Sequence, residues 1–153
     1  MTELSVFSDE HFMKQALNEA QIAFDEGEIP VGAIVVCENK IIAKDHNRVE
    51  RLNDATAHAE MLAITAAQNN LSSKYLNECT LYVTLEPCNM CAGALFWTQI
   101  GKLIIGAPDA ERGFMTFNRN IAHPKTKIKE GVMAADCEVM IKDFFRKLRK
   151  NNG

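Results

Sequence analysis

The sequence contains no long hydrophobic run and no overall excess of positive charge. No segment reaches the roughly eighteen consecutive apolar residues of a membrane-spanning helix, and no apolar stretch follows a basic flank at the N-terminus. We therefore expect neither a membrane span nor a secretory signal, and a cytoplasmic location. The net charge of −3 gives no general attraction to nucleic acid, so such a partner would have to be held by a local patch.

Internal repeats, low-complexity tracts and linkers are also missing, and the 153 residues are predicted to form a single domain over 1–153. Five cysteines are an odd number, and two of them form a Cys-x-x-Cys motif. In a chain without an export signal, this usage favours metal or redox chemistry over a framework of disulfides.

Hydrophobic periodicity predicts alternating helices and strands. Ser8 is a suitable N-cap for the first helix, and Gly27 is a suitable end. Loops are expected at 47–55 and 108–125. Helices are predicted at about 9–26, 57–68, 88–99 and 133–150, and strands at 31–37, 41–44, 80–85, 102–107 and 126–130. This order predicts an α/β domain in which helices cover both faces of one sheet.

Two short stretches, His58-Ala59-Glu60 and Pro87-Cys88-Asn89-Met90-Cys91, offer the ligands of a metal site. We expect both stretches in the first turns of helices that leave neighbouring strands. There the two cysteines lie on one helix face, and the helix N-terminus favours their thiolates. Three ligands with a spare carboxylate are typical of catalytic zinc, because structural zinc usually has four protein ligands. A redox dithiol and a structural zinc site remain the alternatives.

The same stretches match the H-x-E and P-C-x-x-C signature of the zinc-dependent nucleobase deaminases. The longer strings TAHAEM at 56–61 and LYVTLEPC at 81–88 resemble bacterial tRNA-specific adenosine deaminase, as does IPVGA at 29–33. Guanine deaminases share the core motif. The core motif alone therefore does not choose between an RNA base and a free purine.

The resemblance implies a three-layer α/β/α fold of the cytidine-deaminase type, with a central mixed five-stranded sheet. It also implies one Zn²⁺ per chain, bound by His58, Cys88 and Cys91. Hydroxide on the zinc would be the nucleophile, and Glu60 would carry the proton. The reaction implied is hydrolytic deamination of adenosine to inosine at the wobble position of a tRNA anticodon. Conversion of guanine to xanthine, or deamination of another small base or nucleoside, is the alternative.

A second group of residues is expected to contact the substrate. The resemblance implies that Asn47, Ala59, Asp109 and Phe145 border the substrate, although Asn47 could instead stabilise the start of its loop. His46 and His123 are predicted to face solvent or the substrate edge. The last twelve residues carry five basic side chains and one acid, and could meet RNA phosphates or simply be solvated. In the resembling enzymes the second motif-bearing helix contributes to a dimer, so a homodimer is expected.

Overall fold

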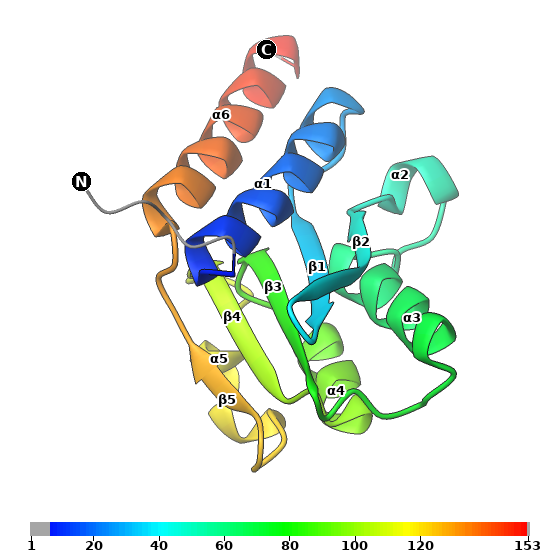
Figure 1. Ribbon diagram of the computed structural model, residues 1–153. Coiled ribbons are helices and arrows are strands. Elements are labelled where there is room, and N and C mark those ends of the chain that lie inside the picture. The colour runs from blue at the N-terminus through cyan, green and yellow to red at the C-terminus, as the bar shows by residue number, and fades with distance from the viewer. Residues whose placement is uncertain (1–6, 153) are drawn as a thin grey trace, which may run out of the picture.

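The computed structural model describes residues 7–152 and places them in one sheet with helices on both sides (Figure 1). The helical segments are α1 (Asp9–Asp25), α2 (Val49–Leu52), α3 (Ala59–Leu71), α4 (Asn89–Thr98), α5 (Phe114–Phe117), the 3₁₀ turn η1 (Arg119–Ile121) and α6 (Ala134–Asn152). The strands are β1 (Gly32–Cys37), β2 (Lys40–His46), β3 (Cys79–Leu85), β4 (Lys102–Ala107) and β5 (Lys127–Lys129). The predicted α/β class and the five strands are confirmed.

The sheet is mixed, and its strands are ordered β2-β1-β3-β4-β5. β1 pairs antiparallel with both β2 and β3, whereas β3, β4 and β5 pair in parallel. The expectation that α3 and α4 leave neighbouring strands is wrong, because the β1–β2 hairpin inserts β1 between β2 and β3. These two strands still run in the same direction, so both helices start from the same edge of the sheet.

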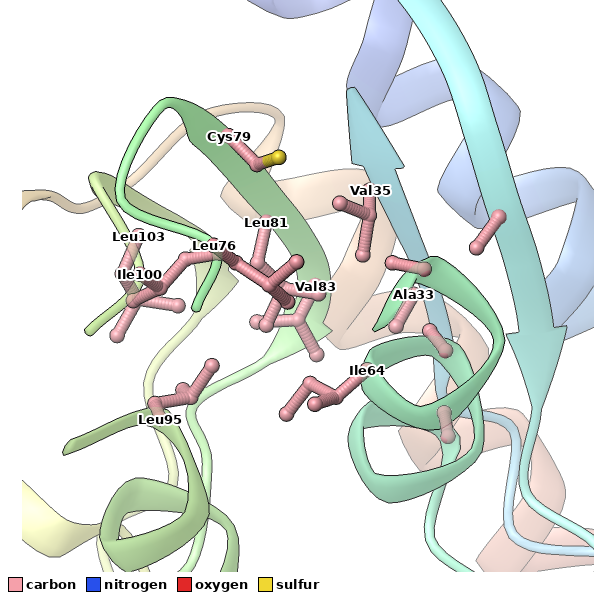
Figure 2. Packing of buried hydrophobic residues seen from close by; sticks show 14 of the residues in the cluster. Ala33, Val35, Ile64, Leu76, Cys79, Leu81, Val83, Leu95, Ile100 and Leu103 are labelled. Atoms are coloured by element: carbon pink, nitrogen blue, oxygen red, sulfur yellow. The ribbon is translucent and has the colours of Figure 1, made fainter. Parts of the chain in front are cut away.

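Alternating side chains of the central strands supply two separate cores. Ala33 and Val35 of β1 lie in the core beneath α3 and α4, whereas Ile34 and Val36 lie in the core beneath α1 and α6. Figure 2 shows the first core, in which Ile64 of α3 and Leu95 of α4 approach the sheet. In Figure 1, α1 and α6 lie side by side on the other face. The three-layer arrangement is therefore confirmed.

The helix boundaries differ from expectation at the two motifs. α1 begins as predicted, since Ser8 Oγ accepts a hydrogen bond from the His11 N–H at 3.0 Å. His58 and Cys88, however, have extended backbones and are the N-cap residues of α3 and α4. Each therefore precedes the first turn instead of lying in it.

Two segments predicted as loops contain short helices. α2 interrupts 47–55, and its Glu50 and Arg51 N–H groups donate to the buried carboxyl of Glu28 at 3.0 and 2.8 Å. α5 and η1 interrupt 108–125. Helical periodicity cannot reveal one-turn helices that are held by distant side chains. No helix within residues 7–152 has the length and apolar composition needed to cross a membrane.

Candidate active site

The structure brings His58, Cys88 and Cys91 together at the edge of the sheet where α3 and α4 start. His58 Nδ1 lies 3.7 Å from Cys88 Sγ and 3.6 Å from Cys91 Sγ. Cys91 is buried, whereas the other two side chains are half-buried. The two N-cap positions and the first turn of α4 thus direct three ligand atoms toward one point, all within 4.8 Å of one another.

These distances fit zinc. Bond lengths of about 2.3 Å to sulfur and 2.0–2.1 Å to nitrogen, at a tetrahedral angle, separate the two ligand atoms by about 3.6 Å. The observed distances from Nδ1 to the two sulfurs are 3.7 and 3.6 Å. Two sulfurs and one imidazole nitrogen are also a donor set that zinc prefers. The three residues can therefore hold zinc and leave one tetrahedral position for another ligand.

Electrostatics at the three side chains favour a thiolate. A hydrogen bond from Cys91, with a further one from His58, lowers the pKa of the Cys88 thiol to about 4. The hydrogen bond to Cys88 raises the pKa of His58, and the hydrogen bond to Cys88 together with burial raises that of Cys91. Near neutral pH the cluster therefore already presents one charged sulfur, the form that binds a metal ion.

Glu60 is the buried carboxyl group beside this cluster. It lies in the first turn of α3, and only 4% of its surface is exposed. Burial raises the pKa of Glu60 to about 7, and its side chain is in hydrogen-bonding contact with Cys91. A carboxyl group with this pKa can both accept and release a proton near neutral pH, as general acid–base catalysis requires.

Asn47 and Ala59 lie on segments that border the cluster. Ala59, fully buried, is the first residue of α3, directly after His58. Asn47 follows β2; its Nδ2 donates to the Ile29 carbonyl at 3.3 Å, and its Oδ1 accepts from the Val49 N–H at 3.4 Å. Asn47 therefore stabilises the start of its loop, which was the alternative to a contact with the substrate. A contact with a base would use the same amide group.

Asp109 and Phe145 lie on other segments than the metal ligands, after β4 and on α6. Asp109 Oδ1 accepts hydrogen bonds from the N–H groups of Glu111 and Arg112, both at 3.1 Å, and so shapes the segment after β4. Phe145 is half-buried on α6, with its ring edge-on to Phe144 at 5.5 Å between centroids. α6 packs on the sheet face opposite α3 and α4.

The expectation that His46 faces solvent or substrate is wrong, because its side chain points toward α1 and only 3% of it is exposed. Its Nδ1 lies 3.1 Å from Glu19 Oε1, and its Nε2 lies 2.7 Å from Glu26 Oε1. Glu26 also pairs with Arg51 of α2. The hydrogen bond from His46 lowers the pKa of the Glu26 carboxyl group. This network, of which only His46 and Glu19 are buried, ties α1 to the turn that carries Asn47.

Replacing His46 with Ala should destabilise the protein by about 3 kcal/mol, because the buried carboxyl group of Glu19 then loses its partner. Urea unfolding followed by circular dichroism measures this change. His123 provides the control: it is half-buried, its ring lies beside Phe96, and it has no ion pair among the described residues. His123→Ala should cost about 1 kcal/mol or less. Equal losses in the two variants would contradict the role given to the network.

His123, predicted to face solvent or the substrate edge, is half-buried. Its ring centroid is 5.4 Å from that of Phe96, and its Nδ1 accepts from the Lys125 N–H at 3.1 Å.

Two cavities of about 370 and 500 Å³ lie at the opposite edge of the sheet, where β3 and β4 begin. Neither is lined by a ligand residue, so both are separate from the candidate metal centre.

Comparisons with known proteins place this site in a family. Residues 7–107 match the family described as the cytidine and deoxycytidylate deaminase zinc-binding region. The chain belongs to this family of zinc-binding deaminases.

Relatives covering nearly the whole chain carry a more specific name. A tRNA-specific adenosine deaminase of Aquifex aeolicus is 49% identical over 146 residues, which are 93% of this chain and 97% of the relative. That of Rickettsia felis is 42% identical over 144 residues, covering 90% and 100%. A solved structure from a study of A-to-I editing by tRNA:A34 deaminases has a TM-score of 0.80 at 37% identity, covering 85% of this chain and 98% of that one. The resemblance inferred from the motifs is thus confirmed.

Proposed function

We propose that residues 1–153 act as one deaminase domain that hydrolyses adenosine to inosine at the wobble position of a tRNA anticodon. The observation that carries the chemistry is the convergence of His58 Nδ1 with the sulfurs of Cys88 and Cys91 beside the buried Glu60. The substrate is supported by relatives named tRNA-specific adenosine deaminase that align over nearly their whole length.

In this mechanism the protein supplies ligands, a proton carrier and a dry environment. His58, Cys88 and Cys91 would hold a zinc ion, which when bound would supply Lewis-acid activation of a water molecule. Hydrolysis replaces the amino group at C6 of adenine with oxygen, so one proton must reach the ring nitrogen and another the departing ammonia. Glu60, with a pKa of about 7, accepts the proton of the water and delivers it to the ring. Its burial keeps bulk water from competing for that proton.

The substrate-binding role of the remaining predicted residues is part of this proposal. Asn47 and Ala59, on the segments beside His58, would border the base, and Asp109 would border the adjoining ribose. Phe145 would stack on a nucleotide beside the target. Basic residues follow it on α6 and are available for phosphate contacts: Arg146, Lys147, Arg149 and Lys150.

We also propose one zinc ion per chain, a homodimer and a cytoplasmic location. Met90, Ala94 and Trp97 lie on one side of α4, and Trp97 is 76% exposed, which is unusual for so large an apolar side chain. A second copy of the chain would cover this side. Analytical ultracentrifugation should give twice the chain mass of 17.1 kDa, and a monomer at micromolar concentration would contradict the homodimer.

The substrate is tested by adding zinc-loaded protein to three compounds in parallel. These are an RNA anticodon stem-loop with an unpaired adenosine at the wobble position, free adenosine and free guanine. We expect ammonia release and inosine formation with the stem-loop. A stem-loop with guanosine at the same position is the matched control and should not react. Reaction with free guanine alone would support the guanine deaminase alternative and contradict the tRNA substrate.

A further inference from the structure

Glu86 is a buried acidic residue whose partners are backbone groups of a distant segment. It follows β3 directly, stands two positions before Cys88, and is 6% exposed. Its Oε1 accepts a hydrogen bond from the Asp109 N–H at 3.1 Å, and its Oε2 accepts one from the Met115 N–H at 3.0 Å. Among residues 7–152 no ion pair involves Glu86. The carboxyl group of Glu86 therefore binds the backbone N–H groups of Asp109 and Met115.

The same short stretch holds the segment after β4 through its backbone. The Glu86 N–H donates to the Ala107 carbonyl at 2.9 Å, and the Pro87 carbonyl accepts from the Phe114 N–H at 2.9 Å. Phe114 is fully buried in the core beneath α3 and α4. Residues 107–115 are thus attached at several points to the residues that immediately precede Cys88.

Gly113 shows how closely this segment fits around Glu86. A Cβ atom at position 113 would lie 2.1 Å from Glu86 Oε2 and 2.5 Å from Oε1. Any residue can adopt the φ angle of −65° at Gly113. Glycine is needed here because there is no room for a Cβ atom, and not because of the backbone conformation. The carboxyl group of Glu86 occupies the volume that a side chain at 113 would need.

We propose that Glu86 is a positioning residue that sets the substrate segment 108–117 against the turn bearing Cys88. The proposal rests on the proposed function, in which Asp109 of this segment borders the nucleotide beside the target base. Because one short peptide carries both the carboxyl group and the cysteine, a shift of the segment relative to the metal ligands requires breaking the bonds to Glu86. Affinity for the RNA flanking the target base thus depends on a residue that does not touch the RNA.

Glu86→Gln tests this proposal, because the amide keeps the shape of the side chain but can accept at only one terminal atom. One of the two N–H groups then faces an NH₂ donor. We expect KM for the anticodon stem-loop to rise about ten-fold, equivalent to about 1.4 kcal/mol, while kcat and zinc content stay near wild type. Hydrogen exchange should accelerate at the amides of Asp109 and Met115 and remain unchanged in α4.

Glu78→Gln is the matched control, since Glu78 is exposed and stands just before the opposite end of β3. It should change neither KM nor amide exchange. Unchanged exchange at Asp109 and Met115 in Glu86→Gln would overturn the proposal, as would loss of zinc or a lower kcat at unchanged KM. If wild-type protein does not convert the stem-loop, the proposed function fails, but the exchange result still decides the role of Glu86.

A double-mutant cycle gives a second test that needs no activity. Gly113→Ala should destabilise the protein and accelerate exchange in 108–117, because the new methyl group meets the Glu86 carboxyl group. In a Glu86→Ala background the same change should have little further effect, since the obstruction is gone. Additive effects would show that Gly113 and Glu86 act independently, and this would overturn the proposal.

Discussion

Glu60→Gln should lower kcat for the anticodon stem-loop by about 10²–10⁴-fold, the usual contribution of a positioned general acid–base group. Gln preserves the volume of this buried side chain but cannot take a proton from water or deliver one to the ring. The three ligand atoms at the site come from His58, Cys88 and Cys91, and none comes from Glu60. The variant should therefore still bind zinc. Single-turnover kinetics at neutral pH measures the loss, and metal analysis of the same sample measures the zinc.

The two measurements separate catalysis from assembly. Activity lost together with zinc would mean that Glu60 acts by maintaining the metal site, which contradicts the role of proton carrier. Full activity in Glu60→Gln would contradict the proposed mechanism itself. Because the pKa of Glu60 is about 7, the replacement should also alter the pH dependence of kcat near neutrality.

Cys88→Ser and Cys91→Ala should each abolish both zinc binding and turnover. A metal centre with three protein ligands has no spare ligand, and removal of one thiolate leaves two donors for the ion. Binding of zinc to the folded wild type at about 100 times Kd should stabilise it by about 2.7 kcal/mol. Thermal unfolding with and without zinc should therefore show a shift for the wild type and none for either variant.

Cys37→Ser is the control for these variants. Cys37 is a half-buried cysteine at the end of β1, where it pairs in register with Cys79 and is not among the converging ligands. It should retain zinc and the thermal shift. A zinc-dependent shift in Cys88→Ser equal to that of the wild type would show that the metal binds elsewhere.

Local patterns in the sequence were sufficient for much of the fold. β-branched runs predicted the strands, and 3.6-residue periodicity predicted α1, α3, α4 and α6, because these signals depend on neighbours along the chain. The metal ligands could be predicted for a similar reason. A Cys-x-x-Cys motif at the start of a helix and a His-x-Glu motif at the start of another carry their spacing in the sequence.

The contacts that hold the site together could not be predicted in this way. His46 and Glu86 resemble ordinary polar residues in the sequence. In the structure, His46 bridges the carboxyl groups of Glu19 in α1 and Glu26 just after it, and Glu86 binds amides more than twenty positions away. α2 depends likewise on the distant carboxyl group of Glu28. No local pattern records such partners, since each pairing exists only after the sheet has formed.

The sequence by itself determined the class of chemistry, because three ligands and a carboxyl group in two short motifs are already a nearly complete zinc deaminase site. Tertiary structure alone decided how these groups meet. β1 is inserted between β2 and β3, and the shared direction of those two strands brings the starts of α3 and α4 to one edge of the sheet. The physical reason is that the positions of ligands within a motif are local, whereas the distance between two motifs depends on strand order and long-range hydrogen bonds.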